Sequence, residues 1–456
     1  MVKQVDESEQ HRYRAALATI WDRSSYDRGF INNPFAGDDE ARRGLARTSA
    51  VLDLLGHPQE RIQLVHVAGS KGKGSTSVLL DAILRAAGMR SGRFTSPHLH
   101  SYRERFIVDD ELITEGAFAS LTEQVMEAVR KAESTTPDLG RITAWELSTA
   151  MALTWFAERM CDVAVIEVGL GGTLDATNVI DPVVSAITRL DFEHTAILGE
   201  TLPEIASNKA GIIKPGRPSV TVEQPDAALS VIQERARHVG SPLLVQNRDW
   251  FVEGDEDKFA VTGPWGSDEK LQTSLVGPHQ VENAALAVAA IKMAFSDDSA
   301  VDYLAIRAGL RSAHHPGRFE RVVREDRTII IDGAHTPIAA DALSAALTRH
   351  VSTEPVTFVI GMLQDKRPDP FLKPLIPRAD RWIVARLDSP RTMPVDLLSE
   401  ALSTLGQRVN GAPSIAAALD LALKDGRNTV VVTGSLTAAA EARVHLGLAS
   451  PDPSPT

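Results

Sequence analysis

Short apolar runs rich in β-branched residues alternate with stretches of helical periodicity along most of the chain. The first run is Ile62–Val67, and Asp162–Val168 is apolar at nearly every position, as expected of a strand buried on both faces of a sheet. In Ser75–Ala87 the apolar positions recur every three to four residues and predict a helix that ends before Gly88. This alternation of strands and helices predicts an α/β fold with a doubly wound, mainly parallel sheet.

The same pattern predicts the rest of a first domain. We expect strands at Val183–Thr188 and Pro218–Val222, and helices at Ile142–Arg159 and Val281–Phe295. The intervening segment Asn247–Gln272 is polar and follows neither period, so we expect a β-hairpin or an insertion there.

A second, smaller α/β unit is predicted after the turn-like segment His314–Arg318. Its expected strands and its first helix are Thr328–Asp332, Val356–Ile360, Arg381–Ala385, Thr429–Thr433 and the helix Ile338–Leu347. We therefore place a P-loop-type domain at residues 1–317 and a Rossmann-like domain at 318–456. The proline-containing tail 450–456 is expected to be disordered.

Composition and charge narrow the classes of protein that fit. The 456 residues are 43% apolar and 24% charged, which is typical of a globular protein. A formal net charge of −12 argues against bulk nucleic-acid binding. Cys161 is the only cysteine, so no intrachain disulfide can form, and a reducing cytoplasm is expected. The N-terminus has no signal-peptide pattern, and no apolar run approaches the ~20 residues of a membrane span.

A glycine-rich segment follows the first predicted strand and precedes the first predicted helix. Gly69, Gly72 and Gly74 let the backbone turn sharply and approach an anion. Lys73 can reach the β- and γ-phosphates of a nucleotide, and Ser75 at the start of the helix can hold Mg²⁺. The pattern G-x-x-G-K-G-S has an extra glycine between the lysine and the serine of the general P-loop pattern, and it marks a narrower class of proteins. We therefore predict an ATP site here rather than a surface turn.

Three further residues gain meaning only in combination. Glu167 lies near the end of a strand that otherwise looks buried, where a carboxylate is costly unless it meets a cation such as Mg²⁺. The alternative is that Glu167 is only a solvated glutamate at the end of a strand and binds no cation. Taken alone, His194 fits a hydrogen-bonded loop histidine, and Lys209 fits an ordinary helix lysine.

Motifs along nearly the whole chain resemble those of the folylpolyglutamate synthase/dihydrofolate synthase family, a branch of the Mur ligase superfamily. The matching segments are VAGSKGKGST, FTSPHLHSYRERF, TAWELSTAMAL, VIEVGLGGTLDATN, the His194 segment, NKAGIIKPG, GPHQVENAALA, HHPGRFE, IIDGAHTP, GMLQDKR, LDSPR and VVTGSL. The resemblance implies an ATP-dependent carbon–nitrogen ligase with a central ATP-binding domain and a C-terminal glutamate-ligase domain. The γ-phosphate would pass to a carboxylate of dihydropteroate or of a reduced folate, and the amine of L-glutamate would attack the acyl phosphate.

The resemblance also implies roles for individual residues. The nucleotide would contact the loop, from Gly69 to Ser75, together with Asn283, Arg318 and Asp332. Two Mg²⁺ sites would draw on Ser75, Ser96, Glu167 and His194. Lys209 falls on a lysine that is carbamylated in the family. The pterin would be held by Thr143, Ala144, Trp145, Glu146, Leu174, Asp175 and Ala176. Lys73, His194 and Lys209 would serve catalysis, and His335 would help to bind glutamate or the acyl phosphate.

Some positions depart from the family pattern, and two other functions stay open. Ser70 and Lys71 stand where many bacterial members have Thr-Asn, and Glu193 replaces an aspartate before His194. One alternative is a Mur-type ligase with a non-folate acceptor, although the 64 or so residues before the loop strand are too few for a UDP-binding domain. The other is a P-loop kinase or regulator, for which the second domain has no obvious use. A monomer is expected from the family.

Overall fold

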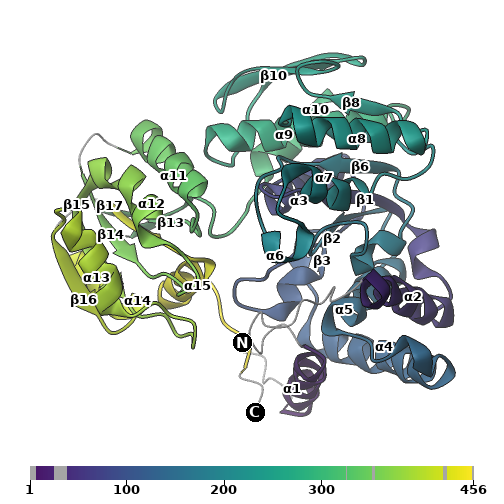
Figure 1. Cartoon of the computed structure of the whole chain (residues 1–456), viewed down its shortest axis with the longest axis horizontal. Helices are drawn as coiled ribbons and strands as arrows, with labels where there is room; N and C mark the ends of the chain where they lie inside the picture. The colour runs from purple at the N-terminus through teal and green to yellow at the C-terminus, as the bar shows by residue number, and fades with distance from the viewer. Residues whose placement is uncertain (1–6, 25–37, 325, 352–354, 425–428, 454–456) are drawn as a thin grey trace.

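The computed structural model describes residues 7–24, 38–324, 326–351, 355–424 and 429–453. A larger N-terminal α/β domain and a smaller C-terminal α/β domain lie side by side (Figure 1). They are joined by the segment between α10 (Tyr303–Ser312) and β12 (Glu320–Arg324). In the described part of the chain, no helix is long and apolar enough to cross a membrane.

The N-terminal domain is built on an eight-stranded sheet. In spatial order its strands are β4 (Glu111–Leu112), β3 (Ile107–Val108), β2 (Ser91–Phe94), β5 (Val163–Glu167), β1 (Gln63–Ala68), β6 (Val184–Ile187), β7 (Ser219–Thr221) and β8 (Leu243–Val245). The six strands from β2 to β8 are parallel, and β3 and β4 add an antiparallel edge. The predicted mainly parallel, doubly wound sheet is confirmed.

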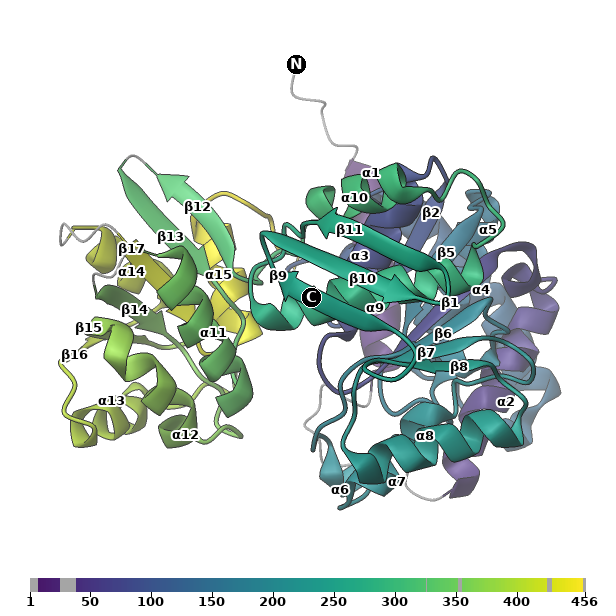
Figure 2. The same cartoon turned by 90° about the horizontal axis from the view of Figure 1, so that it is seen from above.

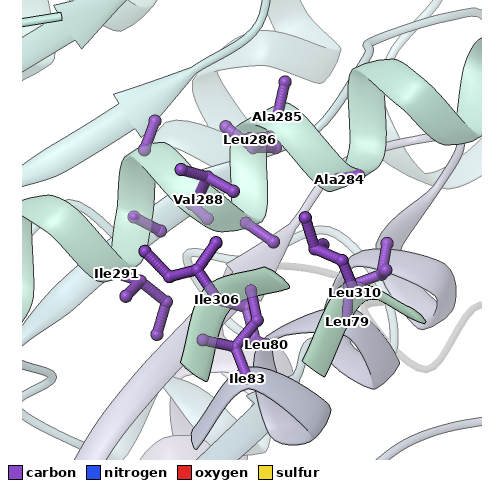
Figure 3. Packing of buried hydrophobic residues seen from close by; sticks show 14 of the residues in the cluster. Leu79, Leu80, Ile83, Ala284, Ala285, Leu286, Val288, Ile291, Ile306 and Leu310 are labelled. Carbon is purple, nitrogen blue, oxygen red and sulfur yellow. The ribbon is translucent and has the colours of Figure 1, made fainter. Parts of the chain in front are cut away.

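Helices cover both faces of this sheet because successive residues of its strands point to opposite sides. Val65 and Val165 pack under one layer, which is formed by α3 (Lys73–Ala86), α9 (Pro278–Ala294) and α10 (Figure 3). Ala164 and Ile166 pack under the other. Its helices are α1 (Glu7–Asp22), α2 (Asp38–Leu54), α4 (Glu115–Thr135) and α5 (Ala144–Glu158). Beyond them in the chain come α6 (Thr195–Leu198), α7 (Leu202–Ala210) and α8 (Asp226–His238).

The polar segment before α9 forms a small antiparallel sheet of its own, as the prediction of a hairpin or insertion anticipated. Its strands are β9 (Phe251–Asp255), β10 (Lys258–Gly263) and β11 (Gly266–Leu271). Figure 2 shows this sheet lying over α9, where Phe259 and Val261 join the core of the domain.

The C-terminal domain is a second, six-stranded sheet with helices on both faces. In spatial order the strands are β12, β13 (Arg327–Ile331), β17 (Thr429–Thr433), β14 (Val356–Ile360), β15 (Ala379–Ala385) and β16 (Val409–Ala412). Only β12 is antiparallel to its neighbour. The helices are α11 (Pro337–His350), α12 (Pro368–Leu372), α13 (Val395–Thr404), α14 (Ile415–Lys424) and α15 (Leu436–His445).

The end of the chain differs from the sequence expectation. We expected residues 450–456 to be disordered, but residues 450–453 run back to the N-terminal domain. There the Asp452 carboxylate accepts hydrogen bonds from the hydroxyl of Tyr13 and from the backbone N–H of Tyr102, at 2.5 and 2.6 Å. A pair of well-placed donors explains why this polar segment follows a defined path. Residues 454–456 lie outside the described part of the chain.

Candidate active site

A cavity of about 2040 Å³ lies between the two domains and gathers the residues singled out by sequence. The glycine loop, the end of β5 and the start of α5 line it from the N-terminal domain, and Asp332 and His335 line it from the C-terminal domain. Every candidate site residue lines this cavity except Gly69, at the start of the loop, and Lys209, whose side chain bonds the Gly69 carbonyl. The roles assigned to these residues stay predictions, but the cavity brings them together.

The glycine loop has the geometry of a phosphate cradle. Gly69 and Gly72 have φ of 147° and 93°, where side chains are strained. A Cβ would lie 1.7 Å from Thr188 Oγ1 at the first position and 2.3 Å from Asn283 Oδ1 at the second. Only glycine fits at either place, and the fourteen-residue helix α3 begins directly after Gly72. Its free N–H groups and its positive dipole end suit an anion. Lys73 Nζ folds back onto the carbonyl of Gly69 at 2.7 Å.

Two residues that the sequence analysis did not assign hold the hydroxyl of Ser75. Gln280 Nε2 lies 3.3 Å from Ser75 Oγ, and Gln280 Oε1 accepts from Asn283 at 3.0 Å. Ser75 Oγ also lies 3.2 Å from His315 Nδ1, and the hydroxyl donates its hydrogen there when the proton of the ring is on Nε2. Burial keeps the pKa of His315 well below its usual value, so its ring is neutral and can accept. The one-turn spacing of Gln280 and Asn283 on α9 is the signal that could have pointed to Gln280.

Glu167 ends β5 beside the loop and is a carboxylate suited to a cation. Its side chain is buried and accepts a hydrogen bond from the backbone N–H of Ser96 at 3.1 Å. Burial raises its pKa to about 7, and Lys73 opposes that rise. A Cβ on Gly74 would lie 3.7 Å from Glu167 Oε2, so the carboxylate borders the phosphate cradle. Hard oxygen donors beside a phosphate loop fit Mg²⁺.

His194 lies at the start of α6 and lines the same cavity. Its backbone is left-handed, with φ of 46°, and burial lowers its pKa. No three His, Cys, Asp or Glu side chains within the described ranges cluster as a metal site. Glu167 and His194 alone are therefore too few ligands for a cation. Hydroxyls such as those of Ser75 and Ser96, and oxygens of a bound phosphate, would have to complete its coordination.

Lys209 is not the ordinary helix lysine that its local sequence suggested. Its side chain is 1% exposed, and Nζ donates to the Gly69 carbonyl at 2.9 Å and to Glu193 Oε1 at 2.7 Å. Burial, and then the charge of Lys73, lower its pKa to about 8. Glu193 was noted only as a departure from the family pattern. In the fold it is the partner of Lys209, and the charges of Lys73 and Lys209 outweigh its burial and lower its pKa.

An aromatic wall stands at the start of α5, where the resemblance placed the pterin. The indole of Trp145 stacks on Phe94 with centroids 5.1 Å apart and donates to Asp175 Oδ2 at 3.1 Å. A Cβ on Gly169 would lie 2.5 Å from the Trp145 ring, so this glycine makes room for it. Leu174 and Ala176 flank Asp175 at the cavity wall.

Thr143 and Glu146 anchor this wall. Thr143 caps α5, and Glu146 completes a capping box at the same helix end. Both oxygens of Glu146 also accept from Arg47, at 2.9 and 2.8 Å, in a buried bidentate pair. Glu146 therefore already serves to orient the helix that carries Ala144 and Trp145.

The C-terminal domain contributes a second set of polar groups. Asp332 accepts from the backbone N–H groups of Phe319 and Ala334 at 2.7 and 2.8 Å, and burial raises its pKa. Arg318 adjoins it in the segment that joins the domains. His335 Nδ1 donates to the Gly333 carbonyl at 2.8 Å. Burial lowers the pKa of His335, so its Nε2 is a neutral acceptor at the cavity.

Residues 67–291 match the Mur ligase middle domain, and residues 317–436 match the Mur ligase glutamate ligase domain. A Haloferax volcanii relative, named a probable bifunctional folylpolyglutamate synthase/dihydropteroate synthase, is 36% identical over 89% of this chain. This chain spans only 48% of that relative. The Bacillus subtilis dihydrofolate synthase/folylpolyglutamate synthase is 32% identical over 88% of this chain and 95% of its own length.

The structure of Escherichia coli FolC in complex with DHPP and ADP superposes with a TM-score of 0.81 and 32% identity. The superposition covers 95% of this chain and 97% of that one. The fold and the sequence of this chain agree with those of these relatives along nearly the whole chain, which identifies its family. The chain belongs to the folylpolyglutamate synthase/dihydrofolate synthase family of the Mur ligases.

Proposed function

We propose that this chain is an ATP-dependent ligase that adds L-glutamate to dihydropteroate, to the γ-carboxylate of reduced folates, or to both. The observation that carries the proposal is the single cavity that a phosphate cradle, an aromatic wall and the polar groups of a second domain line together. A kinase or a nucleotide-binding regulator would need the cradle but neither of the other two walls.

The reaction requires two like-charged groups to meet, the γ-phosphate of ATP and the acceptor carboxylate. The loop N–H groups and Lys73 would hold the phosphates, and Asn283, Arg318 and Asp332 would hold the rest of the nucleotide. The γ-phosphoryl group passes to the carboxylate, the amine of glutamate attacks the acyl carbon, and phosphate leaves as the amide forms. The neutral Nε2 of His335 is suited to accept a proton or a hydrogen bond from glutamate.

Mg²⁺ would neutralise the phosphate oxygens when bound, and Ser75, Ser96, Glu167 and His194 are the residues that would hold it. The Ser75 hydroxyl accepts from Gln280, and one oxygen lone pair remains for a cation when the hydroxyl donates its hydrogen to His315. The buried carboxylate of Glu167 supports the same assignment, because a cation would offset the cost of its burial.

Lys209 is suited to carbamylation. A carbamate forms only on a neutral amine, and a pKa of about 8 leaves a much larger neutral fraction than an exposed lysine has. The modified side chain would be an anion next to Glu193, so the present ion pair would open. A cation shared by the two carboxylate groups would stabilise that arrangement.

A phosphate-release assay with ATP tests the proposal. We expect release that requires both L-glutamate and either dihydropteroate or a reduced folate monoglutamate, with one amide product for each phosphate. A paired assay with the two acceptors decides which of them the chain uses. Phosphate release without glutamate, or only with UDP-linked acceptors, would contradict the proposal. A monomeric state and a cytoplasmic location stay predictions.

A further inference from the structure

His66 is a buried histidine for which the proposed reaction has no direct use. It lies in β1 with its side chain on the face covered by α2 and α5, and it is fully buried. Its Nε2 lies 2.9 Å from the hydroxyl of Thr177. Thr177 is also fully buried and lies in the short 3₁₀ helix Ala176–Val179, directly after Asp175. A polar pair this deep in the core calls for a physical reason.

The donor and acceptor roles along this pair can be worked out from the distances. The Thr177 hydroxyl lies 2.6 Å from Asp175 Oδ1, and a carboxylate can only accept, so Thr177 donates its one hydrogen there. The contact between His66 and Thr177 therefore needs a donor from the ring, which makes His66 the neutral Nε2–H tautomer. Burial lowers the pKa of His66 to about 3, which agrees with a neutral ring, and its Nδ1 has no hydrogen-bond partner within the described residues.

The other end of the chain of hydrogen bonds reaches the cavity. Asp175 Oδ1 also accepts from the backbone N–H of Thr177 at 3.0 Å. Its Oδ2 accepts from the Trp145 indole at 3.1 Å and from the backbone N–H of Leu170 at 2.9 Å. Asp175 and Trp145 both line the cavity, although Asp175 is only 2% exposed. Donors thus meet at Asp175 from both sides, with His66 acting through Thr177 on one side and Trp145 on the other.

We propose that His66 is a positioning residue for the pterin-binding wall, acting through Thr177 on Asp175 and Trp145. The inference rests on the proposed function. The bond from His66 occupies one of the two lone pairs of the Thr177 hydroxyl. It therefore favours the hydroxyl rotamer whose hydrogen points to Asp175. Asp175 then keeps one orientation against the indole, and the substrate meets a wall that needs no rearrangement. A pre-formed wall increases affinity for the pterin and leaves the chemical step at the far end of the cavity unchanged.

Two pairs of variants separate this role from a merely structural one. Thr177→Val removes the hydroxyl at nearly constant shape, and Thr177→Ser keeps it. His66→Leu removes the ring donor, and His66→Gln places an amide N–H near the same position. We expect Thr177→Val and His66→Leu to raise the KM for the pterin substrate about tenfold, the cost of one buried hydrogen bond. The KM values for ATP and glutamate and kcat should change less than about threefold, and Thr177→Ser and His66→Gln should restore most of the affinity.

Thr154→Val is the matched control, because Thr154 is a buried threonine of α5 whose hydroxyl bonds the Ala150 carbonyl of its own helix. It should leave all three KM values unchanged. The indole N–H resonance of Trp145 in the ligand-free protein gives a readout without turnover. It should shift in Thr177→Val and His66→Leu and stay in place in the control.

The double variant His66→Leu/Thr177→Val adds a further test. Both changes break the same chain, so their effects on pterin KM should be far from additive. Additive effects, equal rises in all three KM values, or lower stability with an unchanged pterin KM would each overturn the positioning role. A wild-type protein that lacks turnover with any pterin would overturn the proposed function as well. An active wild type with unaffected variants would overturn this inference alone.

Discussion

At the scale of single residues, Lys209 shows most clearly how burial changes chemistry. Its amine is enclosed beside the loop, and burial together with Lys73 lowers the pKa to about 8. Below that value the amine is mostly charged and only its minor neutral fraction reacts with CO₂, and above it the neutral form dominates. We therefore expect turnover in CO₂-depleted buffer to increase as the pH rises from about 7 to about 9, and added bicarbonate to restore it at the lower pH. Steady-state rates with and without bicarbonate measure this.

Lys209→Ala should nearly abolish turnover at every bicarbonate concentration. It leaves Glu193 without its partner, so a stability loss of about 1–3 kcal/mol is expected, and the fold should persist. Lys214→Ala is a suitable control. Lys214 is a partly buried lysine whose pKa burial also lowers to about 8, and it bonds the Asn178 carbonyl instead of the loop. A bicarbonate response that survives in Lys209→Ala would remove the carbamate proposal.

At the scale of secondary-structure elements, the position of α3 depends on a close approach of α10. Gly309 of α10 faces the backbone of α3, where a Cβ would lie 2.4 Å from Ile83 Cα and 2.5 Å from Ile83 N. Glycine to alanine in a helix normally stabilises by ~1 kcal/mol. Here the backbone of α3 cannot move aside, so Gly309→Ala should instead destabilise by about 1–3 kcal/mol. Thermal and urea unfolding measure the change, and the KM for ATP should rise because α3 carries the loop.

Gly116→Ala in α4 provides the comparison. There the new Cβ would lie 2.4 Å from Glu9 Oε1, the far end of a flexible side chain that can turn away. Its stability should stay constant or rise slightly. If both variants had the same effect, the packing of α10 on α3 would not explain the cost.

Local patterns predicted those elements whose own residues determine them. The strands Val356–Ile360 and Thr429–Thr433 lie where their continuous apolar runs placed them. The helix expected from Val281 begins earlier, at Pro278, because proline suits a first helical turn. The N-terminal helices α1 and α2 were not predicted, since both sequences are mostly polar.

The candidate site shows the same limit. Glycine spacing pointed to the loop, and the family motifs pointed to Glu167 and to the start of α5, all of which contribute to the cavity lining. Local patterns could not predict pairs of residues that only the fold brings together. Examples are Arg47 with Glu146, 99 residues apart, and Ser75 with His315, 240 residues apart. No period along a sequence records a contact between residues so distant, and Lys209 appeared ordinary for the same reason.

At the scale of the whole molecule, several contacts besides the covalent connection link the domains. Val276 packs against the apolar core of the C-terminal domain, and two further contacts involve charged groups. The turn between β9 and β10 meets the end of α11, where Arg349 bonds Asp255 and Asp257 at 2.9 and 2.8 Å, and His350 bonds Glu256 at 2.6 Å. The second contact is the chain end beyond α15, which reaches α1 through Asp452 (Figure 1). The pairs of Arg349 with the exposed Asp255 and Asp257 contribute little each, whereas Glu256, the partner of His350, is buried. The chain end places two short bonds on one partly buried carboxylate, so we expect it to help to hold the domains together as well.

Asp452→Ala tests that role. It removes the acceptor of the Tyr102 backbone N–H and of the Tyr13 hydroxyl, so hydrogen exchange at Tyr102 should become at least about tenfold faster. Burial and then the bond to Asp452 raise the pKa of Tyr13, so its ionisation should move to lower pH in the variant while burial keeps it above the ordinary value. With the chain end released, solution scattering of the ligand-free protein should show a larger radius of gyration.

Asp420→Ala removes an acid that pairs with His445 within the C-terminal domain, and it should change none of these quantities. Unchanged exchange at Tyr102 together with unchanged scattering would mean that the other contacts between the domains and the covalent connection suffice to orient them around the cavity.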